Sequence, residues 1–492
     1  MNNNFKWTRQ LRYQAYQAWP QEYQTLLKEQ VAHSPWRLDY HIQPPSGLLN
    51  DPNGFSFFNG KWHLFYQAYP MGTVHGLKSW YHLTSKNLVD WQEEGLKLLP
   101  STSYDSHGVY SGSALPVNDK LFLAYTGNVR DENWTRTSYQ LGAWMQPNGE
   151  LSKLTTPLIS KPPYGYTQEF RDPQVIFYKD EYFLLLGAQN QNKQGEILVY
   201  RSPDLDTWSY AGPLQFTQQS MGFMIECPNL VFIDGKALLL FCPQGLEQSN
   251  LEYQNIYPNA YIIGEAYNIE TNQLTQPSTL RNLDEGFDLY ATQAFNAPDG
   301  RALAVSWIGL PEISYPTDPF GWAHCLSIVK ELTIENGTLH QRPVKEMSQL
   351  RIDPPCSLNQ SVSQINTEQN RYEINLEFKE NQSGKIHLCS DPMGNNGLIL
   401  SFDRRHGKMK IDRSLSGEVF AEDYGVTREF TISQEPLSLQ IFVDISVVEI
   451  FINDGKQTAT ARIFPSSEQT TLLIECDHAF SGTLWKLRKM NE

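Results

Sequence analysis

The sequence predicts an all-β chain made of a five-bladed β-propeller followed by a C-terminal β-sandwich. One hairpin unit recurs five times, about every 60 residues. The units are rich in aromatic residues, which make up 12% of the chain, and strand-rich repeats of this length are typical of propeller blades. Beyond position 357, apolar and polar residues alternate, as in the strands of a sandwich.

The recurring unit is a tight turn between two short apolar runs. The first example, Asn59-Gly60, separates residues 54–58 from 62–66 and is a strong hairpin signal. Corresponding turns follow at Asp119-Lys120, Asp180-Glu181, Gly235-Lys236 and Gly300-Arg301. A second pattern, Ser-x-Asn/Asp-Leu-x-x-Trp, lies beyond two of the hairpins, at residues 85–91 and 202–208. The second pattern supports one repeated blade over unrelated hairpins.

The chain divides into four segments. Residues 1–36 are expected to form a helical extension, because apolar residues recur at helical spacing up to the Ser34-Pro35 breaker. Residues 37–342 hold the five blades. A polar, proline-bearing linker is expected at residues 343–356, and the β-sandwich at residues 357–492.

Composition excludes several classes of partner. The net charge of −15 argues against binding to nucleic acid or to an anionic membrane. We identify neither a signal peptide nor a transmembrane segment, so the chain is expected in the cytoplasm. The six cysteines form no CxxC pair. They are expected to be reduced and buried, and no metal site or cofactor is predicted.

Three carboxylates stand at a similar place in three different repeats. Asp51, Asp172 and Glu226 each lie nine or ten residues before the second residue of their hairpin turn. Ser111 and Tyr290 hold the corresponding place in the second and fifth repeats. The strand that opens each blade lines the central channel of a propeller, so we expect the three carboxylates to converge in one slot. Like charges brought together are costly unless a function uses them.

Paired carboxylates in a concave site suit cleavage of a glycosidic bond. One acts as nucleophile or base, and the other is held protonated as the acid. Arg171 beside Asp172 is expected to favour an ionised Asp172. Glu226 is flanked by Ile225 and Cys227 and faces other carboxylates, so it is expected to be the protonated acid.

The motifs around these carboxylates resemble those of a known family. Asn50-Asp51-Pro52-Asn53-Gly54, Arg171-Asp172-Pro173 and Glu226-Cys227-Pro228 occur in this order and at blade spacing. They are similar to the motifs of glycoside hydrolase family 32, the invertase and β-fructofuranosidase family. The resemblance extends from about residue 40 to the end. It implies a catalytic propeller, a C-terminal sandwich and retaining hydrolysis of a fructofuranoside.

The resemblance also implies residue roles. Asp51 would be the nucleophile, Glu226 the acid and then the base, and Asp172 the residue that holds fructose hydroxyls and stabilises the transition state. Further residues would bind the substrate: Leu48, Leu49, Asn50, Gln67, Trp80, Tyr110, Ser111 and Arg171. Many relatives carry Phe at position 110, so Tyr110 is expected mainly to pack.

Two segments, residues 74–80 and 104–113, resemble the bacterial sucrose-6-phosphate hydrolases of the family more than its plant or yeast invertases. The phosphate of such a substrate is a dianion that requires cationic partners. His75, Lys78 and Arg130 are the candidates, with solvated loop charges as the alternative. The resemblance implies hydrolysis of sucrose-6-phosphate, of sucrose, or of both, by a monomer or homodimer that takes a small sugar substrate.

Other functions fit part of the pattern. A fructosyltransferase, or a β-fructofuranosidase acting mainly on unphosphorylated sucrose or fructans, would share the motifs. An inverting, arabinanase-like hydrolase would hold its two carboxyls about 6.5–9.5 Å apart, against about 5–5.5 Å in a retaining enzyme. A carbohydrate-binding propeller without catalysis would explain the fold and the aromatic residues but not the three carboxylates.

Overall fold

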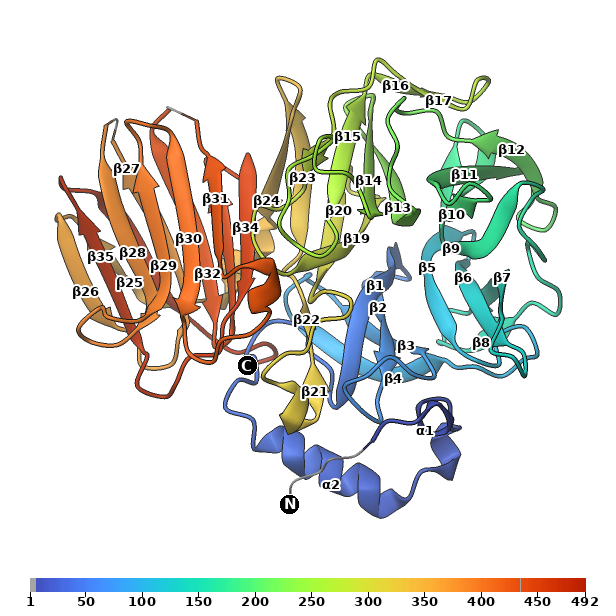
Figure 1. Ribbon diagram of the computed structural model, residues 1–492, viewed down its shortest axis with the longest axis horizontal. Helices are drawn as coiled ribbons and strands as arrows, with labels where there is room; N and C mark the ends of the chain where they lie inside the picture. The colour runs from blue at the N-terminus through green and yellow to red at the C-terminus, as the bar shows by residue number, and fades with distance from the viewer. Residues whose placement is uncertain (1–5, 380, 434) are drawn as a thin grey trace.

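The computed structural model describes residues 6–379, 381–433 and 435–492. Two bodies built of strands lie side by side, with a short helical segment near the N-terminus at the edge of the larger one (Figure 1). In the described chain the larger body holds five blade sheets that follow one another in sequence and a two-stranded sheet of β16 and β17, and the smaller body holds two six-stranded sheets. The predicted all-β class, a five-bladed propeller followed by a sandwich, is confirmed.

Each blade is an antiparallel sheet that begins with its inner strand. The blade strands are β1 Gly47–Phe58, β2 Lys61–Tyr69, β3 Ser79–Ser85 and β4 Trp91–Leu98; β5 Val109–Val117, β6 Lys120–Arg130, β7 Arg136–Met145 and β8 Leu151–Lys153; β9 Tyr166–Tyr178, β10 Glu181–Asn190, β11 Gly195–Ser202 and β12 Ser209–Pro213; β13 Met224–Ile233, β14 Lys236–Gln244, β15 Ala260–Gly264 and β18 Arg281–Asn282; β19 Leu289–Asn296, β20 Ala302–Ile308, β23 Lys330–Glu335 and β24 Thr338–Pro343. Shorter strands are β16 Ala266–Asn268, β17 Gln273–Thr275, β21 Trp322–Ala323 and β22 Cys325–Leu326.

The five inner strands close into a ring. β1 contacts β5 and β19, β9 contacts β5 and β13, and β13 contacts β19. The hairpin turns hold the strands in register, since Asn59 and Gly60 have φ of 49° and 72°, and Asp234 and Gly235 have φ of 50° and 82°. Two successive residues with positive φ are the geometry that matches the twist of paired strands. The inner strands therefore line one central channel.

Apolar side chains between neighbouring blades form the propeller core. Between the second and third blades, Phe122, Leu184, Leu186 and Leu198 have no exposed surface. Burying a side chain of this kind stabilises the fold by roughly 1.5–3 kcal/mol. Similar clusters between the other blades make the channel wall a rigid support for its polar side chains.

The sandwich consists of two antiparallel sheets. One sheet holds β25 Arg351–Leu358, β36 Ser481–Leu487, β27 Arg371–Phe378, β32 Leu437–Asp444, β33 Val447–Ile452 and β34 Gln457–Arg462, and the other holds β26 Val362–Asn366, β35 Thr471–Cys476, β28 Ser383–Ser390, β29 Gly397–Asp403, β30 Lys408–Leu415 and β31 Thr427–Thr431. Their inward faces share one apolar core. Short 3-10 helices complete the chain: η2 Asp318–Phe320, η3 Lys345–Leu350 and η4 Glu422–Tyr424.

The N-terminal extension is helical, with α1 Arg9–Arg12, η1 Tyr16–Ala18 and α2 Gln21–Ala32. Trp19 packs in one cluster with Leu48, Tyr69 and Leu77 of the first blade. The extension is therefore anchored to the propeller by apolar contact. Among the described helices none is both long and apolar enough to cross a membrane.

Two expectations need correction. The linker expected at 343–356 is shorter, because β25 begins at Arg351 and pairs with β36. Its Asp353-Pro354-Pro355 segment fits a strand because β25 is an edge strand with a register shift at this place, where prolines need not donate to a ladder. The cysteines are all unpaired as expected, but Cys356 is exposed and Cys476 half-buried, whereas the other four are buried.

Candidate active site

A β-bulge interrupts the inner strand of every blade where it faces the channel. In β1 the pairing with β2 shifts between Leu49 and Pro52, and β5, β9, β13 and β19 have equivalent shifts. Each bulge adds one residue to the inner strand, which bends the strand and redirects its side chains. Asp172, Cys227 and Ala291 lie in three of these bulges with positive φ of 65°, 49° and 49°.

The bulges place the three carboxylates at different positions along their inner strands. Counted back from the first paired residue after each bulge, Asp51 is one residue away, Asp172 two and Glu226 three. The expectation of one shared slot is therefore wrong in detail: the carboxylates converge but are staggered by one residue from blade to blade. Spacing alone missed this because the hairpins differ in length.

Asp51 lies half-buried on the bulge of β1. Its Oδ2 accepts a hydrogen bond from the Ser111 hydroxyl at 2.5 Å, and its Oδ1 accepts one from the Asn50 amide at 3.1 Å. Burial raises the pKa of Asp51; the Ser111 hydrogen bond opposes the rise, and Glu226 adds to it. The two donors favour the charged form that a nucleophile requires.

A ring of hydrogen bonds fixes these donors. Asn50 Nδ2 also donates to Gln67 Oε1 at 2.9 Å, and Gln67 Nε2 donates to Ser111 Oγ at 2.5 Å. Lys78 Nζ donates to Asn50 Oδ1. Burial lowers the pKa of Lys78 to about 7, and Asp51 opposes this shift. Each group around Asp51 is thus held in place before any substrate arrives.

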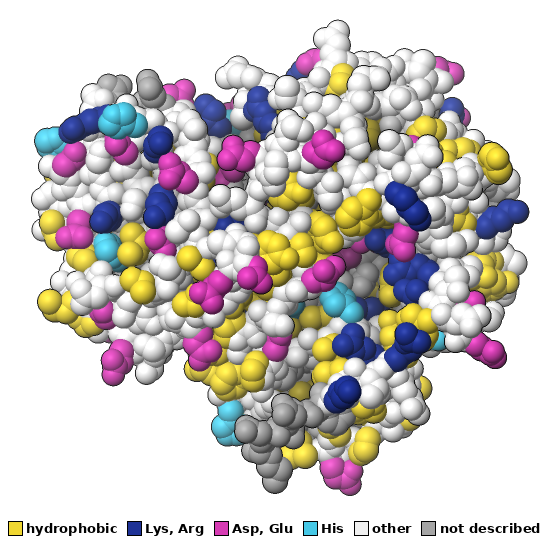
Figure 2. Space-filling model, in the orientation of Figure 1, with side chains coloured by type: hydrophobic (Ala, Val, Ile, Leu, Met, Phe, Trp, Pro, Cys, Tyr) yellow, Lys and Arg dark blue, Asp and Glu magenta, His cyan; other side chains and the backbone are white. Residues whose placement is uncertain are grey.

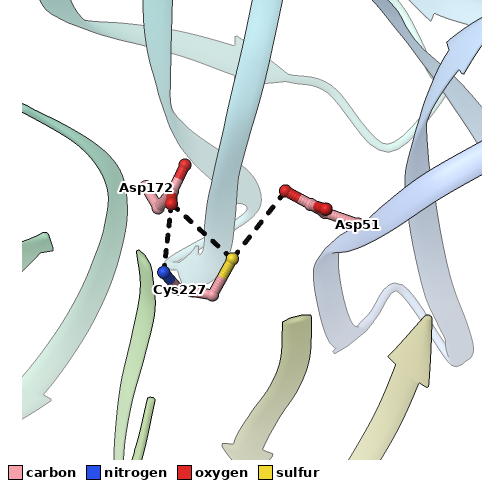
Figure 3. Close-up of side chains that lie close together, drawn as sticks. All are labelled: Asp51, Asp172 and Cys227. Atoms are coloured by element: carbon pink, nitrogen blue, oxygen red, sulfur yellow. Dashed lines mark hydrogen bonds between the residues drawn. The ribbon is translucent and has the colours of Figure 1, made fainter. Parts of the chain in front are cut away.

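Asp172 and Asp51 flank Cys227 (Figure 3). Asp172 Oδ2 accepts the backbone N–H of Cys227 at 3.0 Å, and the thiol lies 3.6 Å from the same oxygen and 3.8 Å from Asp51 Oδ2. Burial, followed by the charge of Glu226, raises the pKa of Asp172 to about 7. Both aspartates face one small volume at the floor of the channel.

Glu226 has four donors. Arg171 donates from Nε at 2.9 Å and from Nη2 at 2.8 Å to Oε1. The Tyr290 hydroxyl and Gln244 Nε2 each donate to Oε2 at 2.8 Å. The side chain remains 17% exposed. This carboxyl is therefore oriented from two sides and still reachable from the channel.

The pairing of Arg171 corrects the expected charge pattern. The guanidinium forms ion pairs with Glu226 and Glu169, and its charge lowers the pKa of Asp172 as expected, but burial and then Glu226 outweigh this effect and raise the pKa to about 7. Glu226 accordingly faces a cation where apolar neighbours and carboxylates were expected. The sequence argument failed here because adjacent side chains on a bulged strand point in different directions.

The structure also brings together a possible set of metal ligands. One ligand atom each of Asp51, Asp172 and Cys227 lies within 4.8 Å of the others. Burial, and then the two carboxylates, raises the pKa of the Cys227 thiol, and a protonated thiol is a poor metal ligand. The arrangement fits a pair of carboxylates better than a metal centre.

Comparison with known proteins decides the family. The N-terminal domain of glycosyl hydrolases family 32 matches residues 41–343, and the C-terminal domain of the same family matches residues 338–483. The chain belongs to glycosyl hydrolases family 32. It is therefore a glycoside hydrolase.

Several family 32 relatives are similar over nearly the whole chain. A sucrose-6-phosphate hydrolase of Pediococcus pentosaceus is 49% identical over 98% of this chain and 97% of its own length, and one of Streptococcus mutans is 46% identical over 97% and 98%. The solved structure of sucrose-6-phosphate hydrolase from Lactobacillus gasseri superposes with a TM-score of 0.96 and 46% identity, covering 99% of this chain and all of that one. The Bombyx mori GH32 β-fructofuranosidase BmSUC1 superposes with a TM-score of 0.84 and 30% identity, covering 95% and 98%.

Three residues assigned to substrate binding are buried in apolar clusters. The side chains of Leu48 and Leu49 are 2% and 0% exposed and pack in apolar clusters. Trp80 is fully buried, and its Nε1 donates to the backbone oxygen of Tyr110 at 2.9 Å. Their packing supports the strands that carry the family 32 site, and contact of these three side chains with a sugar stays a prediction.

The remaining candidates lie nearer the channel. Tyr110 is half-buried on the bulge of β5 and His75 is exposed on the loop before β3. Arg130 is half-buried at the end of β6, whereas Lys78 is only 2% exposed and engaged with Asn50. Lys78 therefore lies buried beside Asn50 and Asp51 and is not an exposed loop charge.

Sequence analysis missed three residues of this site. Tyr290 and Gln244 bind Glu226, and Thr126 accepts the backbone N–H of Asp172 at 3.0 Å. Tyr290 was visible as the fifth-repeat equivalent of the carboxylates. Gln244 and Thr126 stand on second strands, where no pattern in the sequence distinguishes them.

Proposed function

We propose that this chain is a retaining β-fructofuranosidase that hydrolyses the fructofuranosyl bond of sucrose-6-phosphate, and also that of sucrose. The observation that carries the proposal is that Asp51 and Asp172 flank Cys227, while the charge of Glu226 raises the pKa of both aspartates. The relatives named sucrose-6-phosphate hydrolase, at 43–49% identity over nearly the whole chain, support the phosphorylated substrate.

In the first step, Asp51 attacks the anomeric carbon of the fructosyl unit. The bond from this carbon to the bridging oxygen breaks, and Glu226 gives its proton to that oxygen as the second sugar leaves. A fructosyl ester on Asp51 results. The Ser111 and Asn50 donors hold the attacking carboxylate in place, and Asp172 accepts hydrogen bonds from fructose hydroxyls as positive charge develops on the ring.

In the second step, Glu226 takes a proton from water, and the oxygen of this water attacks the same carbon. The ester bond to Asp51 breaks, which restores the carboxylate and the protonated Glu226. Two inversions give net retention. Arg171, Tyr290 and Gln244 orient Glu226 for both roles, because four donors fix its two oxygens.

The cellular setting is part of the proposal. Six unpaired cysteines support residence in the cytoplasm, where thiols stay reduced. The substrate is a small sugar, and the working form is a monomer or homodimer.

A side-by-side measurement of kcat/KM on sucrose-6-phosphate and sucrose tests this function. We expect hydrolysis of both, with the higher value for the phosphorylated sugar. Release of free fructose must track loss of substrate; transfer of fructose to a second sugar as the main reaction would instead indicate a fructosyltransferase. Absence of hydrolysis of either sugar would reject the proposal.

A further inference from the structure

An open cleft lies beside Glu226 at the mouth of the channel. It has a volume of about 540 Å³, and its lining includes Arg130, Arg136, Glu169, Arg171 and Lys193. Arg171 also binds Glu226, which protonates the departing sugar in the proposed function. The cleft is therefore the space into which that sugar extends.

Arg130 and Arg136 stand directly opposite each other where β6 and β7 meet their connecting turn. Like charges in directly opposed positions destabilise a pair of strands. Arg136 pairs with Glu169 at 2.6 Å, and Glu169 also binds Arg171, so one carboxylate serves two guanidinium groups. Within the described residues Arg130 has no acidic partner. This corner thus holds an excess of positive charge in a chain whose net charge is −15.

Each of the two arginines has one N–H donor without a hydrogen-bond partner among the described residues. The Nε atoms of Arg130 and Arg136 are buried and have no hydrogen-bond partner among the described residues. Buried polar groups in folded proteins are normally satisfied, so an unpaired one requires an explanation. These buried Nε atoms lie out of reach of the cleft, so an anion there would bind the Nη atoms of the two side chains and offset the like charges.

The N-terminal extension closes the same corner. The ring of Tyr13 lies 4.9 Å from Trp134 and 5.8 Å from His107, and Arg9 stacks on Trp134 at 4.3 Å. The Arg130 guanidinium lies 5.7 Å from the same indole, and its Nη1 donates to the Trp134 carbonyl at 3.1 Å. Trp134 therefore couples the position of Arg130 to the extension.

The hydroxyl of Tyr13 lies among these cations. Burial, and then the charge of and a hydrogen bond to Tyr110, raise the pKa of Tyr13, whereas Arg130 and Arg136 lower it. Figure 2 shows Lys and Arg side chains gathered on this face of the propeller, next to a hollow. Tyr13 is not among the residues that line the cleft, so the extension acts on the cleft through Trp134 and Arg130.

We propose that Arg130 and Arg136 bind the phosphate of the phosphorylated sugar that leaves, and that the Tyr13 hydroxyl helps to position Arg130. A phosphate dianion offers several acceptor oxygens, and planar guanidinium groups bind it with paired N–H donors. The proposal rests on the proposed function and deepens it. It assigns the helical extension a part in substrate selection and excludes Lys78, whose ammonium is engaged with Asn50.

The variants Arg130→Gln, Arg136→Gln and Tyr13→Phe test this assignment. For each we measure kcat/KM on sucrose-6-phosphate and on sucrose, and the inhibition constants of glucose 6-phosphate and glucose. We expect the ratio of the two kcat/KM values to fall roughly ten- to a hundredfold for each arginine, and a few-fold for Tyr13→Phe. Inhibition by glucose 6-phosphate should weaken in the same order, while inhibition by glucose stays as in the wild type.

Arg201→Gln is the matched control, since Arg201 also pairs with a glutamate, Glu181, at 2.6 Å but lies on the outer strand β11. Its ratio should equal that of the wild type. If the wild type prefers sucrose-6-phosphate and both arginine variants keep that preference, the phosphate subsite lies elsewhere and only this inference falls. An equal loss of kcat/KM on both substrates would assign the arginines a structural role and would also overturn this inference. A wild type that hydrolyses both sugars equally well contradicts the phosphate subsite, whereas one that hydrolyses neither rejects the proposed function itself.

Discussion

The channel of the propeller and its interface with the sandwich both bury charged groups, but they surround them differently. At the interface, His41 lies between Asp444 at 2.8 Å and Glu449 at 3.0 Å, and Lys330 lies 3.3 Å from Glu449. In the channel, Asp51 takes part in no ion pair within the described chain, and the same is true of Asp172. The interface pairs its buried charges, whereas in the channel Glu226 is paired with Arg171 but the two aspartates are not paired.

The pKa values follow this difference. Burial alone would lower the pKa of His41, but hydrogen bonds to Asp444 and Glu449 outweigh it and raise the value to about 9. The pKa of Asp172 is instead raised to about 7 by burial. Buried charges with partners hold the two domains together, whereas buried carboxylates without them store free energy that a reaction can use.

The largest effect is expected in the channel. Asp51→Asn should lower kcat by about 10⁴-fold or more, because no covalent intermediate can form. The free energy of unfolding should stay the same or rise, since a buried charge is removed. Steady-state kinetics and urea denaturation of the same preparation measure both quantities. A variant that retains more than a tenth of the activity contradicts the assigned role.

The opposite effect, a loss of stability with unchanged kcat, is expected at the interface. Asp444 accepts three backbone N–H groups, of Asp39, Tyr40 and His41, besides the imidazole. Asp444→Asn should lower the free energy of unfolding by about 3–5 kcal/mol, because it leaves a buried imidazolium without its main partner. The kcat of the folded fraction should not change. Loss of activity without loss of stability in Asp444→Asn would contradict the distinction between the two regions.

The interface should also respond to pH. Between pH 6.5, the ordinary pKa of histidine, and about 9, the folded state binds more protons at His41 than the unfolded state does. The free energy of unfolding should therefore fall as the pH rises through this range. Denaturation at several pH values measures the slope, and His41→Gln should flatten it. A slope of the opposite sign would show that His41 is neutral in the fold.

The smallest effect is expected for Asp172. Its pKa of about 7 in the fold, against 3.8 in the unfolded chain, means that the charged form costs stability above pH 7 and costs nothing below pH 3.8. Asp172→Asn should stabilise the fold by on the order of 1 kcal/mol above pH 7 and by progressively less as the pH falls. Thermal melts at several pH values test this. Equal melting temperatures throughout would place Asp172 in a balanced environment like that of Asp444.

The sequence predicted what depends on local pattern. Turns such as Asn59-Gly60 and the spacing of the hairpins are local, so the blades and their number followed from them. The position of Asp51, Asp172 and Glu226 on the inner strands followed from the same spacing. Alternation in residues 372–378 and 437–443 likewise predicted strands of the sandwich.

What the sequence could not give depends on tertiary contact. The bulges that stagger the carboxylates change side-chain direction without leaving a mark in residue spacing. Arg171 forms an ion pair with Glu226, on another blade, and none with its sequence neighbour Asp172 among the described residues. The burial of Lys78 against Asn50 and the contact of Tyr13 with Trp134 depend on segments far apart in the chain.

The configuration of the transfer product tests the central claim most directly. In the presence of methanol, a fructosyl-enzyme on Asp51 gives methyl fructofuranoside, whose anomeric configuration is stable and can be read by NMR. Attack by Asp51 followed by base assistance from Glu226 predicts the β-anomer, with the configuration of the substrate retained. Formation of the α-anomer would contradict the account, because it requires direct displacement without a covalent bond to Asp51.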